Sequence, residues 1–173
     1  MSTLEVNTID SVSGTSNLTI GSSNSSQITL KSGATLTNFP DNTPYFKADL
    51  TTGQAVSATT WTTLNINNVI YDTASAFSTS TYAFFAPAGK YFFTGSAGNN
   101  SAINYLYVSI YKNGSAALQV QADTSNAGIL NCNGILDSNG SDYFQLKVFT
   151  ASSTTITADA HRTYFSGFKL VGS

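Results

Sequence analysis

The sequence predicts an all-β domain, a sandwich or jelly roll, on three observations. Good helix formers such as Glu, Lys, Arg and Met are scarce, and charged residues make up only 9% of the 173 residues, so few segments favour a helix. β-branched and aromatic residues are abundant, as they are in strands. These residues occur in short runs interrupted by Gly and Asn, and many short strands separated by turns are typical of a two-sheet fold.

Residues 1–40 differ in composition from the rest, and we expect them to form a short β-structured N-terminal arm. Apolar pairs alternate with polar residues and are separated by Ser and Gly turns, as in half-buried strands. So few large apolar side chains cannot bury a core alone, so the arm is expected to pack against other chains. Pro40 and Pro44 end it, because proline interrupts strand pairing. The apolar pairs are Leu4 and Val6, Leu18 and Ile20, and Ile28 and Leu30.

Residues 41–173 are expected to form a compact head. Asn113-Gly114 is the strongest turn signal, because both residues tolerate the positive φ of a type I′ hairpin. Asn133-Gly134 and Asn139-Gly140 repeat this dipeptide and predict two further turns. The expected strands, placed where apolar and β-branched residues run between turns, are 45–49, 60–66, 68–72, 81–86, 90–96, 104–112, 116–122, 128–132, 142–150, 153–158 and 163–171.

The strand expected at 104–112 has two apolar faces. Aliphatic residues occupy one face, and Tyr105, Tyr107 and Tyr111 share the other. The outer face of a sandwich is normally polar, so the tyrosines predict a subunit interface, where a large ring with a polar tip is favoured. The last strand repeats the pattern with Tyr164 and Phe168. Coverage by the chain's own loops is the alternative explanation.

Several segments of the head resemble, in order, the motifs of the complement C1q-like globular heads. The segment 84–93 matches F-x-x-P-x-G-x-Y-x-F, and 164–168 resembles the closing F-S-G-F. The resemblance implies a ten-stranded jelly roll of the tumour-necrosis-factor type that assembles as a homotrimer, with Tyr164, Phe168 and Tyr107 near the trimer contact. Further matches are Asn68 with Tyr71, Asp72 and Phe77, the K-N-G strand end at 111–114, and the 142–146 strand.

The arm resembles a different class of protein. Animal C1q-like proteins usually have a signal peptide and a collagen stalk, and this sequence shows neither feature. The segments 4–10 and 18–21 instead resemble repeat units in the tail-fibre-like virion proteins of tailed bacteriophages. This resemblance implies a virion-surface location and assembly in the host cytoplasm. Three such arms could wrap around one another and together bury the apolar side chains that one arm cannot bury alone.

The composition excludes several partners. Only 7 Lys and Arg residues are present and the net charge is −2, whereas a nucleic-acid binder needs clustered cations to neutralise phosphates. No apolar run reaches the ~18 residues that a membrane-spanning helix needs. We therefore expect neither nucleic acid nor a membrane as partner.

No pattern of residues indicates catalysis. The single histidine, His161, follows Asp159, but no G-x-S-x-G elbow accompanies it, and we interpret the pair as part of a surface loop before the last strand. No pair of carboxylates suited to glycoside cleavage is visible. The single cysteine, Cys132, lies among apolar residues and is expected to be buried. We expect a non-enzymatic protein without a cofactor.

One loop offers ligands for a cation. Asp137, Asn139 and Asp142 supply oxygen atoms at spaced positions, as a calcium loop does. The loop lacks the distal bidentate Glu of such sites and is equally well interpreted as a hairpin turn. Both interpretations stay open at this point.

Together these features predict a homotrimeric virion structural protein, a capsid decoration or fibre protein whose residues 1–40 dock onto a capsid or tail protein. The alternative is a receptor-binding tip that recognises host cell-surface glycan. In that case we expect contacts from the loops at 97–104 and 123–140, with Tyr105 and Asn99-Asn100 as candidates. A depolymerase fragment is disfavoured, because the carboxylate pair is missing.

Overall fold

The computed structural model describes residues 43–124 and 128–171. They belong to the second of the two units into which the chain divides, Met1–Phe39 and Pro40–Ser173. The described residues form thirteen strands and no helix, which confirms the all-β prediction; none of them therefore belongs to a helix that could cross a membrane. The predicted arm residues Leu4, Val6, Leu18, Ile20, Ile28 and Leu30 lie outside the described residues.

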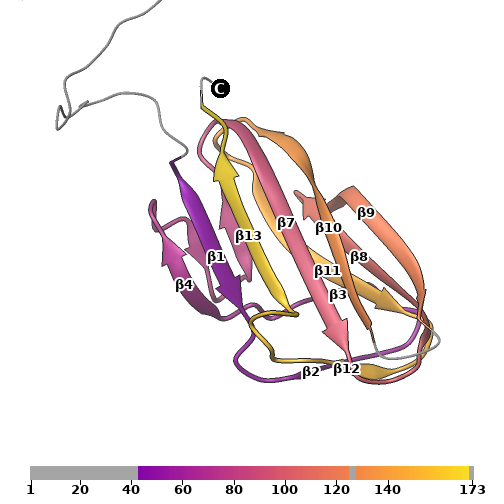
Figure 1. Cartoon of the computed structure of the whole chain (residues 1–173). Helices are drawn as coiled ribbons and strands as arrows, with labels where there is room; N and C mark the ends of the chain where they lie inside the picture. Colours follow the sequence, from indigo (N-terminus) through magenta and orange to yellow (C-terminus); the bar gives the residue numbers. More distant parts are fainter. Residues whose placement is uncertain (1–42, 125–127, 172–173) are drawn as a thin grey trace, which may run out of the picture. The chain divides into compact units, whose positions relative to one another are not determined.

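Seven strands form sheet A, which faces the viewer in Figure 1. They are β1 (Tyr45–Asp49), β2 (Gln54–Val56), β4 (Asn68–Asp72), β7 (Gly89–Asn99), β10 (Gly128–Ser138), β12 (Thr154–Ile156) and β13 (Tyr164–Lys169). The order is β2-β12-β7-β13-β1-β4, and β10 pairs with β7 along its whole length. All pairings are antiparallel, and β10, β2 and β4 each have a single neighbour and so lie at edges of the sheet.

Six strands form sheet B behind it. They are β3 (Thr62–Thr63), β5 (Phe77–Ser78), β6 (Ala83–Phe85), β8 (Asn104–Lys112), β9 (Ser115–Thr124) and β11 (Tyr143–Thr150). The order is β5-β6-β11-β8-β9, with β3 beside β11. The two sheets therefore form an antiparallel sandwich, as the spacing of strands and turns predicts.

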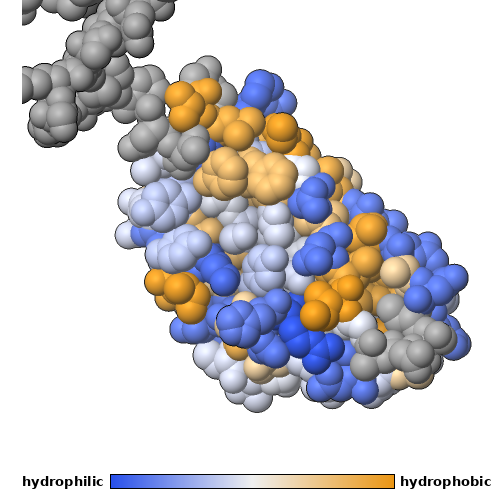
Figure 2. Space-filling view, in the orientation of Figure 1, coloured by the Kyte–Doolittle hydropathy of each residue, from blue (hydrophilic) through white to orange (hydrophobic). Residues whose placement is uncertain are grey.

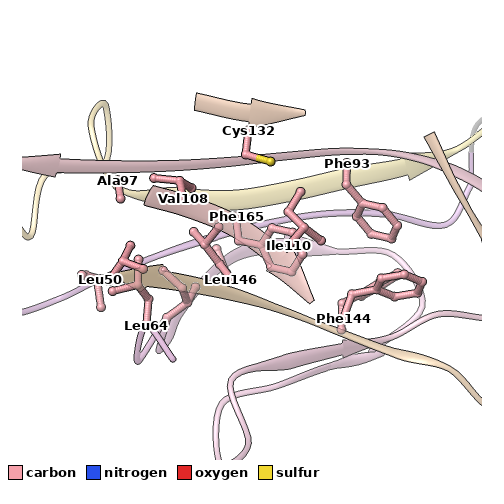
Figure 3. Close-up of a cluster of buried hydrophobic side chains, with 14 of the residues drawn as sticks. Leu50, Leu64, Phe93, Ala97, Val108, Ile110, Cys132, Phe144, Leu146 and Phe165 are labelled. Carbon is pink, nitrogen blue, oxygen red and sulfur yellow. The ribbon is translucent and has the colours of Figure 1, made fainter. Parts of the chain in front are cut away.

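Aromatic and aliphatic side chains from both sheets fill the space between them (Figure 3). Phe46 of β1 stacks on Phe84 of β6 with ring centroids 4.1 Å apart, and Phe93 of β7 lies 4.5 Å from Phe144 of β11. These rings are essentially inaccessible to solvent, and each such burial contributes about 1.5–3 kcal/mol. The core thus joins the first strand of the domain to strands far along the chain.

The predicted hairpin at Asn113-Gly114 is confirmed. Both residues have positive φ, 51° and 82°, and Lys112 pairs with Ser115 at the end of the β8–β9 ladder. A two-residue turn of this type matches the twist of its strands. The turn joins β8 to β9, and the ladder between them shifts register once, between Ile110 and Tyr111.

The predicted turn at Asn133-Gly134 is wrong, because both residues lie inside β10. Gly134 pairs with Phe93 of β7, and a Cβ at this position would lie 2.8 Å from Leu118 Cδ1. The glycine therefore leaves room for the Leu118 side chain of β9 rather than forming a turn. The strand consequently runs to Ser138, beyond the predicted end at 132.

Candidate binding surfaces

Aromatic rings cover the outer face of sheet B. β8 directs its aliphatic residues into the core and its tyrosines outward. Phe149 of β11 lies opposite Tyr107 in the strand register, with ring centroids 5.7 Å apart. Trp61, just before β3, lies 6.0 Å from Tyr107 and 5.5 Å from Phe149. The rings of this aromatic platform belong to Trp61, Tyr105, Tyr107, Tyr111 and Phe149.

Backbone pairing brings Trp61 onto this face. The amide of Thr59 donates to the carbonyl of Thr150 at 2.8 Å, and Thr62 pairs with Val148 of β11. Trp61 and Phe149 were not predicted from the sequence, because neither lies in the run of tyrosines. The alternation of Phe149 with buried Val148 and Thr150 is the signal that points it outward.

An open hollow of about 350 Å³ lies in the platform, lined by four of its rings and by Gln119 of β9. Beside it, the Lys147 ammonium lies 4.5 Å from the centre of the Tyr111 ring, a favourable cation–π position. Burial raises the pKa of the Tyr111 hydroxyl, which therefore stays protonated. The surface thus combines ring faces with hydroxyl and amide groups that donate and accept hydrogen bonds.

The outer face of sheet A carries an apolar row that crosses five strands. Tyr45 of β1 pairs with Phe168 of β13, and Phe168 pairs with Phe92 of β7. Phe92 pairs in turn with Ile135 of β10, which is 57% exposed. At the other end, Tyr71 of β4 lies 5.5 Å from Tyr45 between ring centroids. Figure 2 shows apolar side chains gathered on this face over β13, β7 and β10. The apolar row is Tyr71, Tyr45, Phe168, Phe92 and Ile135.

The predicted interface residues lie on two opposite faces. Tyr105, Tyr107 and Tyr111 belong to the aromatic platform on sheet B, whereas Tyr164 and Phe168 point outward from sheet A. Tyr164 lies under the ammonium of Lys47, 5.2 Å from its ring centre. The two sets therefore do not form one patch, and the interface role of each remains a prediction.

The edges of the two sheets meet along β9 and β10. A hollow of about 310 Å³ lies between these strands, lined by Leu118 and Val120 of β9 and by Cys132 of β10. Cys132 is only 3% exposed, as predicted, and burial raises the pKa of its thiol. This hollow lies at the side of the sandwich, and Gln119 lines both it and the hollow of the platform.

Asp142 anchors the turn between β10 and β11. Its carboxylate accepts hydrogen bonds from the Asn139 amide at 2.9 Å and from Asn113 Nδ2 at 2.6 Å, and it pairs with Lys112 Nζ at 2.9 Å. These contacts, the Asn139 amide foremost, lower the pKa of Asp142 to about 2. The carboxylate is thus occupied by the two neighbouring turns that it joins.

The three candidate calcium ligands each have partners within the chain. Asp137 pairs with Lys90 Nζ at 2.6 Å, while Asp142 is held as just described and the Asn139 side chain accepts from Ser141. Within residues 43–124 and 128–171, no group of three or more His, Cys, Asp or Glu side chains could hold a metal ion. The geometry favours the hairpin-turn interpretation.

Most residues of the two predicted glycan-binding loops belong to strands, so the prediction of loops there is wrong. Residues 97–99 belong to β7 and residues 128–138 to β10. Arg162 fastens the short connection after β7, because its guanidinium donates to Asn100 Oδ1 at 2.5 Å and to the Asn99 carbonyl at 3.0 Å. Asn99 and Asn100 thus have partners within the chain.

His161 lies exposed in the turn before β13. Its backbone amide donates to Asp159 Oδ1 at 2.8 Å. This arrangement confirms the interpretation of the pair as a surface loop.

No family model and no curated protein matches the chain, but solved structures do. The globular domain of zebrafish complement 1qA has a TM-score of 0.53 and 17% identity, over 73% of this chain and 97% of that one. Murine APRIL has a TM-score of 0.61 at 10% identity, over 73% and 98%. Eiger TNF from S. frugiperda has a TM-score of 0.60 at 12% identity, over 78% and 95%. The two sheets described above therefore form the jelly roll of the C1q and TNF globular domains, as predicted.

Proposed function

We propose that the chain is a non-enzymatic structural protein of a tailed-bacteriophage virion, a homotrimeric capsid decoration or fibre protein anchored by residues 1–40. The apolar row on sheet A carries the self-association. Four side chains in continuous register, with Tyr71 in ring contact at one end, leave an apolar strip on the outer face of a sheet, and contiguous strips of this kind mark interaction sites. A second copy of the chain is the partner, in agreement with the homotrimer that the C1q-like resemblance implies.

The geometry of a closed ring selects the second contact surface. In a trimer each subunit offers two different patches, and the rotation between them must close after three steps. The outer faces of sheets A and B point in opposite directions, so stacking one on the other would produce an open array. The β9–β10 edge points sideways, and its hollow can receive ring side chains. The proposed contact therefore places the apolar row, with Tyr164 and Phe168, on the β9–β10 edge of a neighbour.

The virion assignment rests on the arm. Residues 1–40 resemble repeat units of phage tail-fibre-like proteins and contain too few apolar residues to bury a core alone. Docking on a capsid or tail protein would supply the missing burial. The head would then be displayed at the virion surface.

Glycan recognition at the host cell is the second candidate function. The aromatic platform favours it, because rings with hydroxyl and amide neighbours face outward on sheet B. The two functions are compatible in one molecule, since the platform lies opposite the apolar row.

Three experiments test these proposals. Light scattering of the dilute protein is expected to give a mass near three times 18.2 kDa, and a stable monomer would refute the trimer. Deletion of residues 1–40 is expected to abolish incorporation into virions while leaving the trimer; unchanged incorporation would refute the anchor. Host-cell adsorption by the purified protein separates the candidates, because a purely bracing protein does not bind cells.

A further inference from the structure

The aromatic platform is an outward-facing surface that the fold of one chain does not explain. Strand residues facing solvent are normally polar, yet β8, β11 and the segment before β3 each contribute rings to the same face. These rings pack on one another: Tyr105 lies 5.6 Å from Tyr107 and 6.2 Å from Phe149, nearly parallel to the latter. They are therefore held in place before any ligand arrives, which lowers the entropic cost of binding.

The hydrogen-bonding groups around the rings indicate the chemistry of the ligand. The tyrosine hydroxyls and the Gln119 amide both donate and accept hydrogen bonds. Gln119 is exposed, so its side chain can reach a ligand in the hollow. Groups that donate and accept are best matched by a ligand whose own groups do both, as the hydroxyls of a sugar do.

The charges near the platform indicate a neutral ligand. Lys147 contributes one cation, which lies over the Tyr111 ring. Asp123 of β9, opposite Tyr105 in the register, contributes one anion at the other end. A single-stranded nucleic acid needs a positively charged groove, and an acidic polymer needs the same. The platform has no positively charged groove, so a neutral ligand fits it best.

We propose that the aromatic platform binds a neutral oligosaccharide. In this assignment the apolar C–H faces of the sugar rings stack on Trp61 and Phe149, and the sugar hydroxyls bond to Gln119 and to the tyrosine hydroxyls. The hollow of about 350 Å³ lies at the lower end of the ~300–1,000 Å³ range of ligand sites, so it suits a short stretch of glycan. The inference deepens the glycan-recognition candidate above and rests on it.

The contact extends along β11. Tyr143, Gln145, Lys147 and Phe149 alternate with buried residues of this strand and so share its outer face over about 20 Å. Phe85 of β6 lies 6.0 Å from Tyr143 between ring centroids, beside a second hollow of about 250 Å³. Two ring-lined hollows along one face favour a chain of several sugars over a single monosaccharide.

A proline-rich peptide is the alternative occupant of an aromatic surface. Its prolines offer carbonyl acceptors but no amide donors. It would therefore satisfy donors on the platform and leave the acceptor of Gln119 unused. The oligosaccharide matches both kinds of group, and the peptide becomes a control in the test.

Trp61 makes the test direct, because it is the only tryptophan of the chain and its fluorescence therefore reports on the platform alone. The full-length protein is titrated with neutral hexasaccharides of glucose, mannose and N-acetylglucosamine, and separately with decaproline and heparin. A saturable change in emission with at least one neutral hexasaccharide, and none with decaproline or heparin, is expected. No response to any neutral sugar, or a response to decaproline alone, would overturn the proposal.

Variants then locate the binding. Tyr107→Ala is expected to weaken binding about tenfold, as the loss of one aromatic contact does. Gln119→Ala changes an exposed residue at the platform hollow. It tests the proposed hydrogen bond to the sugar even if the tyrosine variant fails to fold. Ile70→Ala, which shortens an exposed side chain of β4 outside both surfaces, is the control and should bind normally. If Gln119→Ala and a folded Tyr107→Ala both bind the sugar as tightly as the wild type does, the assignment is overturned.

The outcome can be separated from the proposed structural role. Sugar binding is measured on purified protein, whereas the trimer is tested by its mass and the virion location by incorporation. Loss of binding in Tyr107→Ala with an unchanged mass supports the platform alone. Absence of binding leaves the trimer and the anchor as they stand.

Discussion

Gly95 of β7 lies directly against Leu146 of β11 across the sandwich, so that a Cβ on residue 95 would overlap Leu146 Cδ1 and lie 3.5 Å from Ile110 Cγ1. The missing side chain lets the two sheets approach at the centre of the core. Sheet separation at this point is therefore set by a single residue with no side chain.

Gly95→Ala is expected to lower the free energy of unfolding by about 1–3 kcal/mol, the usual cost of overpacking. Leu146→Val removes the overlapping δ-carbon and should recover part of this loss in the double variant. Urea unfolding of the four proteins at one concentration measures the coupling. Additive effects of the two substitutions would show that the contact does not limit the packing.

The hydroxyl of Tyr91 is fully buried and has no hydrogen-bond partner among the described residues. Tyr91→Phe is expected to raise the free energy of unfolding by about 1 kcal/mol, because an unsatisfied buried group is removed. Tyr71→Phe removes an exposed hydroxyl and serves as the control. Thermal unfolding checks both, and a destabilised Tyr91→Phe would mean that the hydroxyl has a partner after all.

The same residue predicts an alkaline limit to stability. Burial raises the pKa of Tyr91 from 10.0 to about 12, so the folded state favours the neutral hydroxyl. Below pH 10 the hydroxyl is neutral in both the folded and the unfolded state. As the pH rises from 10 to about 12, the unfolded state ionises first, and the free energy of unfolding falls. The difference in stability between the wild type and Tyr91→Phe should change over this range, and a constant difference would contradict the assignment.

Asp142 predicts the opposite dependence at acid pH. Its pKa falls from 3.8 to about 2 on folding, so the ionised carboxylate stabilises the fold above pH 4 and loses this effect as the pH falls to 2. Asp142→Asn should lower stability at neutral pH and flatten the acid slope. Asp137→Asn, at an exposed ion pair, should change little. Urea unfolding midpoints at several pH values measure these effects. If the midpoints of the wild type and the two variants depend equally on pH, the prediction is refuted.

The apolar row predicts a simple way to dissociate the proposed trimer. Phe168→Glu would place a charge without a partner in a buried contact, at a cost of about 3 kcal/mol or more per site, and should yield monomers. Phe85→Glu adds the same charge at an exposed ring on sheet B and should leave the mass unchanged. Light scattering measures both masses. A folded Phe168→Glu trimer would place the interface elsewhere.

Much of the fold could be predicted from local pattern. The bounds of β1, β4 and β8 agree with the expected 45–49, 68–72 and 104–112, because alternation and turn residues coincide in those segments. Short strands were predicted only where they lie within a longer run of apolar or β-branched residues, as β3 and β12 do; β2 and β5 have no such run and were missed. The failure at Asn133-Gly134 has another cause: Gly134 is required by Leu118 of a different strand, which no local pattern reveals.

The binding surfaces were predicted less completely. The tyrosines of β8 could be assigned to one outward face, because a strand alternates with period two. Their separation from Tyr164 and Phe168 follows from which strand joins which sheet, and this pairing is non-local. Trp61 reaches the platform through the pairing of the segment around β3 with β11, and this non-local pairing leaves no signal in the local sequence.

The place of β1 in sheet A sets when the domain can fold during synthesis. β1 lies between β4 and β13, so the first described strand gains its second neighbour only when the last strand has left the ribosome. β8, β9 and β11 of sheet B come earlier along the chain and can pair first. Such long-range pairing folds slowly and leaves apolar surface exposed meanwhile. The nascent chain is therefore expected to expose apolar surface until β13 has been synthesised, and assembly of the head with other subunits can begin only after that point.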